Sequence, residues 1–261
     1  MKGLMSAVKW ETILSIKESI SYRVSFYMDM MIFVGAFLVI YYMGIGSAFS
    51  SFYEVNRVTG QTLVLIGYIF WQNASAALGA SSSIIQAELA RGLFEVRMQS
   101  KYKVSVVIFA KTLVMIVIDC FSYLLIMLFS AVTVGFEVKN IYAVLLSILL
   151  SIPSILGMYG IGLILGGISV KQKRLGSVVM IIQTGMLIVS NALSPTRNAV
   201  VGLIPFSLGI EIVRDVYMGQ YVNPVTVIAY LLVNALWLLI GEVYFTKALK
   251  YERQYGAFDN Y

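Results

Sequence analysis

Long apolar stretches separated by short polar segments dominate the chain from residue 24 onward. A helix needs about 20 mostly apolar residues to cross the hydrocarbon core of a bilayer. Six stretches approach or exceed this length with few or no charges, so we predict an all-α integral membrane protein. The six transmembrane helices are expected at about residues 24–44, 62–85, 111–134, 141–170, 175–193 and 224–245. The fourth stretch is so long that its helix must tilt, bend or extend past the core.

The segment before the first predicted span has the pattern of an amphipathic helix. Residues 2–23 place apolar side chains on one broad face and charged ones opposite, which suits a helix lying in the membrane interface. The apolar residues are Leu4, Val8, Trp10, Ile13, Ile16 and Ile20, and the charged ones are Lys2, Lys9, Glu11 and Glu18.

A second non-spanning helix is predicted between the last two spans, in residues 194–223. Pro205 is well placed to start it, and the apolar residues after Pro205 are interrupted by Glu211, Arg214 and Asp215. The helix is too short and too charged to span, so we expect an external re-entrant hairpin. No domain boundary or tandem repeat is visible, and residues 1–261 are expected to form a single transmembrane domain.

Composition supports the membrane prediction and excludes several kinds of chemistry. Hydrophobic residues make up 59% of the chain, charged residues only 12%, and the mean hydropathy is +0.86. A soluble domain has roughly 25% charged residues. Histidine is absent and Cys120 is the only cysteine, which excludes disulfides, Cys/His zinc sites and Ser-His or Cys-His catalysis. We therefore expect no metal in this chain, and an intramembrane enzyme is disfavoured.

The distribution of lysine and arginine predicts the orientation. If the chain crosses six times, 15 of its 19 basic residues fall on the side of both termini and four on the other. Cytoplasmic loops are enriched in Lys and Arg, so both termini are expected in the cytoplasm. The net charge of +6 then reflects topology, not nucleic-acid binding.

The most informative cytoplasmic segment is residues 86–103. Glu88, Arg91 and Glu95 have helical spacing, with three apolar residues, Leu89, Phe94 and Met98, available for the opposite side. Gly92 weakens a continuous helix and indicates a bend or a close backbone contact. Two interpretations remain open here: a docking surface for a cytoplasmic partner, or a solvated basic loop that contacts nothing.

Two groups of polar residues within the predicted spans are candidates for function. Carboxylates at membrane depth are costly and suggest function by default; they are Asp29, Asp119 and Glu242. Asp119 is the deepest of the three. It either couples transport to an ion or has a structural role as a hydrogen-bonded side chain. The uncharged group is Trp71, Gln72, Asn73, Gln183 and Asn191. These line a translocation path or form interhelical hydrogen bonds.

An energy source is missing from the sequence. There is no Gly-x4-Gly-Lys-Ser/Thr phosphate loop. If transport is driven by ATP, nucleotide and Mg²⁺ must bind to another chain.

The order of elements resembles the membrane subunit of ABC-2-type ABC transporters, in the bacterial subgroup of stand-alone permeases of about this length (the type V exporter-like fold). The likeness begins at the amphipathic helix that ends in Tyr22 and Arg23. It continues with Glu88-Leu-Ala-Arg-Gly-Leu-Phe-Glu95, which is similar to the coupling-helix pattern of that family. It ends with the hairpin after Pro205 and a short basic tail.

This resemblance implies a bacterial cytoplasmic-membrane exporter. Two permease subunits, identical or sister chains, would pair, and separate ATP-binding subunits would dock beneath them. The implied coupling residues are Glu88, Arg91, Gly92, Glu95 and Arg97, with Lys171 and Arg174 as a lesser contact. The implied substrates are drugs, antibiotics, peptides or lipids, which would cross between spans like the second and the fifth.

Two alternatives are kept. Ala90-Arg91-Gly92 also resembles a coupling motif of the transmembrane subunit of vitamin importers, although only one copy is present. An ion-coupled secondary transporter would use Asp119 or Glu242, but no inverted repeat is visible.

Overall fold

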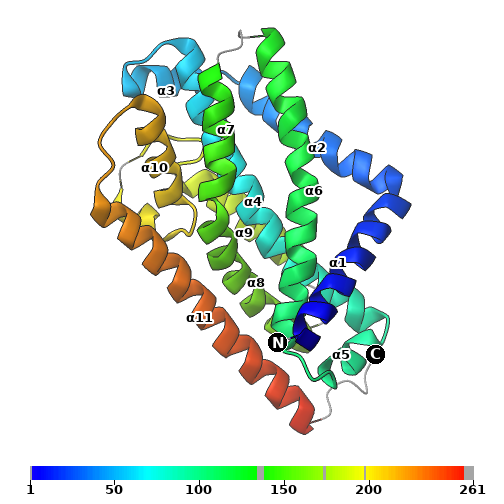
Figure 1. Ribbon diagram of the computed structural model, residues 1–261. Helices are drawn as coiled ribbons and strands as arrows, with labels where there is room; N and C mark the ends of the chain where they lie inside the picture. The colour runs from blue at the N-terminus through cyan, green and yellow to red at the C-terminus, as the bar shows by residue number, and fades with distance from the viewer. Residues whose placement is uncertain (1, 134–137, 173–174, 197, 256–261) are drawn as a thin grey trace.

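Helices account for all regular secondary structure in the computed structural model, which describes residues 2–133, 138–172, 175–196 and 198–255. The all-α prediction is therefore confirmed over these residues. The helices form an elongated bundle in which several elements run along its length (Figure 1).

One end of the bundle brings together segments that are far apart in the sequence. The start of α1 (Lys2–Ser21), the short helix α5 (Leu93–Met98) and the end of α11 (Pro224–Tyr255) lie at this end (Figure 1). Helices α3 (Ile45–Tyr53) and α10 (Ser207–Met218) lie towards the opposite end. The two described ends of the chain thus lie at the same end of the bundle.

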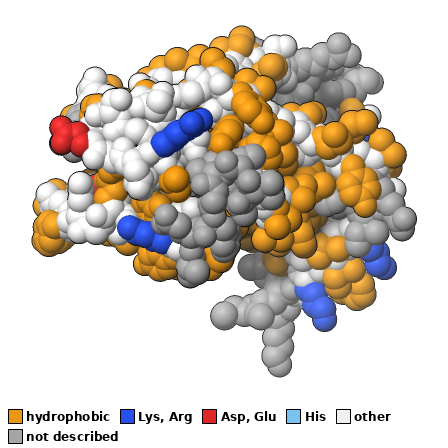
Figure 2. Space-filling view, turned by 90° about the horizontal axis from the view of Figure 1, so that it is seen from above, with side chains coloured by type: hydrophobic (Ala, Val, Ile, Leu, Met, Phe, Trp, Pro, Cys, Tyr) orange, Lys and Arg blue, Asp and Glu red, His pale blue; other side chains and the backbone are white. Residues whose placement is uncertain are grey.

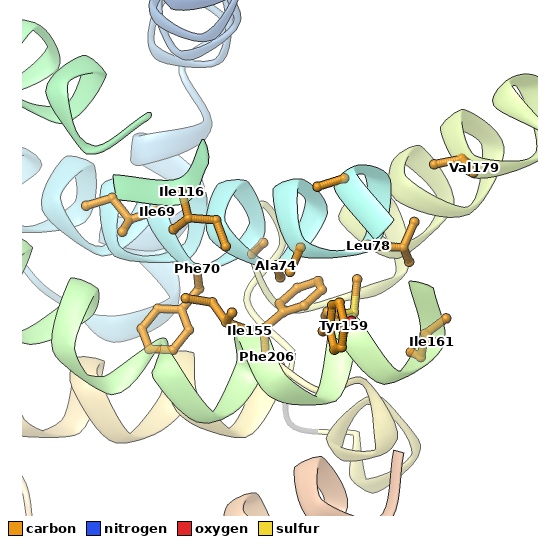
Figure 3. Packing of buried hydrophobic residues seen from close by; sticks show 14 of the residues in the cluster. Ile69, Phe70, Ala74, Leu78, Ile116, Ile155, Tyr159, Ile161, Val179 and Phe206 are labelled. Atoms are coloured by element: carbon orange, nitrogen blue, oxygen red, sulfur yellow. The ribbon is translucent and has the colours of Figure 1, made fainter. Parts of the chain in front are cut away.

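Helix α4 (Arg57–Ala90) is the central element. In its most apolar stretch 83% of the residues are buried, against 17% in α11. Side chains from α4 interdigitate with those of neighbouring helices, for example Phe70 and Ala74 with Ile155 and Phe206 (Figure 3). Helix α4 therefore forms the core, while α11 exposes most of its apolar surface, as a helix facing lipid does.

The first apolar stretch continues beyond its predicted end. Helix α2 (Arg23–Tyr42) is followed by α3, and residues 30–42 and 45–53 are bent by 57° relative to each other. The bend occurs at Gly44, whose φ of +73° is the left-handed conformation that glycine adopts most readily. The sequence analysis did not predict α3.

The long fourth stretch is divided, as its length suggested. Helix α7 (Val138–Leu150) and α8 (Ile152–Gln172) meet at Ser151, and Pro153 is the second residue of α8. Proline lacks an amide hydrogen and its ring clashes with the preceding turn. Pro153 therefore explains the break between the two helices at Ser151.

Glycines let α8 approach both of its main neighbours. A Cβ atom added to Gly160 would lie 2.3 Å from the carbonyl oxygen of Trp237 in α11, and one added to Gly241 would lie 2.1 Å from the carbonyl oxygen of Gly160. On the α4 side, a Cβ added to Gly162 would lie 2.8 Å from the carbonyl oxygen of Leu78. The backbones are in contact, which is how small residues promote helix packing in membranes.

The predicted hairpin is helical where expected. Helix α10 follows Pro205 and ends at Gly219, which has a left-handed φ of +72°. A short 3₁₀ helix, η1 (Ala199–Leu203), precedes it. The carbonyl oxygen of Pro205 accepts a hydrogen bond from Asn234 of α11, which attaches the hairpin to that helix.

Arg214 of α10 is fully buried, and its role was missed in the sequence analysis. Its guanidinium group donates to the carbonyl oxygens of Leu63, Asn191 and Ala192 at 2.8–3.2 Å. Its Cζ atom lies 4.6 Å from the centre of the Phe49 ring. A buried charge needs such partners; Arg214 thereby ties α10 to α3, to α4 and to the segment after α9 (Gly176–Val189).

Among the described residues, four helices are long and apolar enough to cross a membrane: α4, α6 (Val104–Thr133), α8 and α11. The bent pair α2–α3 gives a fifth crossing if it counts as one span, whereas α7 and α9 are apolar but shorter. Seen from above, hydrophobic side chains are numerous on the described part of the face, and charged side chains are few and separate from one another (Figure 2). The chain has the helices of a multi-pass membrane protein.

Helix α1 forms as predicted but uses its faces differently. Trp10 and Leu14 are exposed, whereas Glu11, which was predicted on the charged face opposite the apolar one, is only 17% exposed at its side chain. Glu11 turns inward because Arg97 and Lys111 lie there. The exposed apolar residues remain available to contact lipid.

Candidate functional site

The candidate site is the sharp turn that follows α4, together with α5. Helix α4 ends at Ala90, and Gly92 then adopts a φ of +68°, a left-handed conformation that costs a residue with a Cβ atom more than it costs glycine. The chain reverses there and enters α5. Of the two possibilities predicted at Gly92, the structure has the bend and not a close backbone contact, since an added Cβ would have no neighbour within 4 Å. Residues 86–103 therefore do not form one continuous helix.

Helix α5 has one buried side and one exposed side. Phe94 and Met98 are buried against the bundle, whereas Leu93 and Val96 are 52% and 67% exposed. Arg253 at the end of α11 donates a hydrogen bond to the carbonyl oxygen of Met98. Apolar packing and this bond together fix α5 to the end of the bundle.

Four charged residues form a cluster beneath the turn. Arg97 Nε lies 2.6 Å from Glu88 Oε2, and Arg97 Nη2 lies 3.0 Å from Glu11 Oε1. Lys111 Nζ lies 2.9 Å from Glu11 Oε1 and 3.1 Å from Glu88 Oε1. The side chains of this charge cluster are 8–20% exposed. Two carboxylates and two cations balance, so no net charge is buried.

The charge cluster joins four helices. Glu11 belongs to α1, Glu88 to α4, Arg97 to α5 and Lys111 to α6. Each cation contacts both carboxylates, so displacing α5 disturbs ion pairs to α1 and α4 together. A force applied to α5 is therefore transmitted to several helices, not to one.

The electrostatics at Glu11 favour its ionised form. Burial raises the pKa of Glu11, but the hydrogen bond from Lys111 and the positive charges of Arg97 and Lys111 outweigh burial, so the pKa is lowered from its ordinary value. Glu11 thus remains an anion within the cluster at neutral pH.

The outer side of α5 combines charge with apolar surface. Arg91 and Glu95 are exposed beside Leu93 and Val96. Exposed apolar groups with a polar rim are typical of surfaces that bind a protein partner.

No protein-family model matches the chain, and no curated protein matches it. The role of α5 is therefore inferred from its own geometry. Lys171 and Arg174, the second predicted contact, do not add to it: Lys171 lies in α8, but its side chain and the whole of Arg174 lie outside the described residues.

The uncharged candidate residues take part in separate contacts between helices and do not form one group. Trp71 Nε1 donates to the carbonyl oxygen of Gln183, and Gln183 Nε2 donates to the carbonyl oxygen of Ser75, so both residues join α4 to α9. Both are half-buried, which leaves them partly accessible at the α4–α9 contact.

Asn73 and Asn191 are buried and form hydrogen bonds between helices. Asn73 donates to Ser151 at 2.9 Å and accepts from Tyr123 at 2.6 Å. Asn191 donates to the carbonyl oxygen of Ser207. Gln72 is only 1% exposed, and neither of its amide atoms has a hydrogen-bond partner among the described residues. These three residues do not share one contact with Trp71 and Gln183.

The three carboxylates have different surroundings. Glu242 accepts a hydrogen bond from Ser105 at 3.0 Å and lies 3.5 Å from Lys103 Nζ. Asp119 is half-buried in α6. Asp29 lies in α2, but its side chain is outside the described residues.

Proposed function

We propose that this chain is the permease subunit of an ATP-driven ABC exporter of the ABC-2 type. The observation that carries the proposal is α5: a short helix after a left-handed glycine, paired with α1 and α4 through Arg97 on its inner side and exposed on its outer side. An ATP-binding subunit would dock on Leu93, Val96 and the charges beside them.

The mechanism is a transmission of movement. Closure of the ATP-binding subunits would push α5, and the charge cluster would pass that movement to α1, α4 and α6. Because α4 is the buried core of the bundle, its tilt would reposition the helices packed around it. This chain has no phosphate loop, so ATP and Mg²⁺ would bind to the partner.

The proposed topology has six crossings: α2, α4, α6, the broken pair α7–α8, α9 and α11. Both termini and α5 would lie in the cytoplasm, on the side that carries most of the lysines and arginines. Helices α3 and α10 would lie at the outer side of a bacterial cytoplasmic membrane.

The translocation path would run along the α4–α9 contact, where two copies of the permease, or this chain and a sister permease, would meet. Trp71 and Gln183 support this placement because they are half-buried and join those two helices. An aromatic ring beside an amide suits an amphipathic or hydrophobic substrate such as a drug, antibiotic, peptide or lipid.

Co-purification with an ABC-type ATPase tests the docking. Val96→Arg should abolish recovery of the ATPase with the solubilised permease, because it places a charge in the apolar centre of the contact. Tyr221→Arg, at an 83% exposed position after α10, should leave it unchanged. Equal recovery with Val96→Arg and the unmodified chain would exclude docking through α5.

Transport by the reconstituted complex separates ATP-driven transport from ion-coupled secondary transport. We expect substrate movement in liposomes that contain ATP and the ATP-binding subunit, and none with an ion gradient alone. Transport by the permease alone on a proton or sodium gradient would instead favour a secondary transporter.

A further inference from the structure

A cleft of about 440 Å³ lies at the same end of the bundle as α5, between α11 and the segment that leads from α5 into α6. Phe245 and Leu249 of α11 give it a buried apolar lining, and Lys103, Lys250 and Arg253 surround it with positive charge. This combination belongs to neither the charge cluster nor the exposed side of α5.

Positive charge is in excess in the cleft. Among the described residues that line it, the one carboxylate is Glu242, which already accepts a hydrogen bond from Ser105 and pairs with Lys103 at 3.5 Å. Lys250 and Arg253 are exposed. Arg253 donates a hydrogen bond to the carbonyl oxygen of Met98, which is an uncharged acceptor. Three cations and one carboxylate leave an excess of two positive charges among the described lining residues, which suits an anionic ligand.

The cleft lies where the apolar helices end. Lys103 immediately precedes Val104, the first residue of the apolar helix α6, and Lys250 lies in the last two turns of α11. Where the cleft lining begins at Glu242, α11 exposes Leu239, three residues earlier, and Val243, the next residue, at 65% and 53%. A molecule in the cleft thus has charged side chains around one part and a lipid-facing helix surface beside the other.

We propose that this cleft binds the phosphate-bearing head group of an anionic phospholipid, whose acyl chains lie along the exposed apolar side of α11. Basic pockets beside membrane-spanning helices are suited to acidic head groups, and the volume matches the lower range of ligand pockets. Through Arg253 and Met98 the bound lipid would also be connected to α5.

The test is a titration of the full-length purified protein with phosphatidylglycerol, followed by native mass spectrometry. Lys103→Ala/Lys250→Ala should weaken binding about 25-fold, since each basic residue contributes about fivefold. The matched control is Lys101→Ala/Lys247→Ala, which removes two exposed lysines from the same segments but outside the cleft lining. It should change binding less than threefold. An equal loss in both double variants would overturn the site.

Two further measurements keep the proposal testable if the double alanine variant does not fold. Glu242→Gln retains a hydrogen-bond acceptor for Ser105 but removes the competing charge, so it should strengthen phosphatidylglycerol binding about fivefold; unchanged binding would contradict the site. Phosphatidylcholine and free glycerol phosphate should each bind at least tenfold more weakly than phosphatidylglycerol. Equal binding of either would show that anionic lipid is not the ligand. No ATP-binding subunit is present in these measurements, so their outcome is independent of the proposed export function.

Discussion

Arg97 Nε lies 2.6 Å from Glu88 Oε2, across the reversal of the chain at Gly92. The two residues are nine positions apart and lie in different helices, so their contact exists only because Gly92 turns the chain back. This ion pair holds α5 against the end of α4.

Removing the charge of Glu88 should loosen this end of the bundle. Glu88→Gln leaves Arg97 and Lys111 with Glu11 as their one carboxylate partner among the described residues. Removing one charged partner of a buried ion pair leaves the other charge buried without full compensation. We therefore expect a loss of about 2–4 kcal/mol in the free energy of unfolding. Reversible unfolding in detergent micelles measures it. Glu95→Gln, the same change on the exposed side of α5, should cost less than 0.5 kcal/mol, roughly the limit for a surface substitution; similar losses in both would refute the cluster's role.

Gly92→Ala should strain the turn through the backbone alone. An added Cβ atom has no neighbour within 4 Å, but the φ of +68° disfavours any side chain, at a cost of about 1–2 kcal/mol. Gly176→Ala, where φ is not positive and the space is also open, should cost nothing. Thermal unfolding of both variants provides the comparison, and the prediction is wrong if they unfold alike.

Acid should release α1 from the bundle. The pKa of Glu11 is lower in the folded protein than its ordinary value of 4.5. The unfolded chain therefore binds the proton more readily, and the stability that Glu11 contributes is complete above about pH 4.5 and is lost as the pH falls through the lowered folded value. The unfolding midpoint should fall over that range, and less so in Glu11→Gln. If Glu11→Gln shows the same acid dependence as the unmodified chain, another group is responsible.

The contact between α8 and α11 should tolerate no added atom. Gly160→Ala would place a Cβ atom 2.3 Å from Trp237 O and 2.6 Å from Leu238 Cα, both backbone atoms that cannot rotate away. We expect a loss of about 2–3 kcal/mol in the free energy of unfolding, since overpacking forces the helices apart. Gly35→Ala in α2 meets nothing within 4 Å and should be neutral or slightly stabilising. Equal stability of the two variants would contradict the packing.

Hydropathy and local chemistry were sufficient to predict most helices and two of their boundaries. The six apolar stretches all fall on helices, Pro205 precedes α10, and Gly92 ends the helix before α5. Each of these features depends on residues adjacent in the sequence: a run of apolar side chains, a fixed φ, or a missing Cβ.

Contacts between distant residues were not predictable in the same way. Glu11 appeared to belong to an outer polar face because its partners, Arg97 and Lys111, are at least 86 positions away. The burial of Arg214 could not be predicted, because its acceptors are main-chain carbonyls, which exist at every position and leave no mark in the sequence. An arginine among the apolar residues of a short helix, beside Glu211 and Asp215, was the available signal.

Docking of an ATP-binding subunit on the exposed side of α5 is tested most directly by cross-linking from a single position. Cys120 is the only native cysteine, so a Cys120→Ala background gives one reactive thiol per variant. Val96→Cys, labelled with a photoreactive maleimide in native membranes, should form a covalent product with an ABC-type ATPase. Tyr221→Cys, towards the opposite end of the bundle, should form none. A cross-link from Tyr221→Cys, or none from Val96→Cys while the ATPase co-purifies, would contradict the proposed docking.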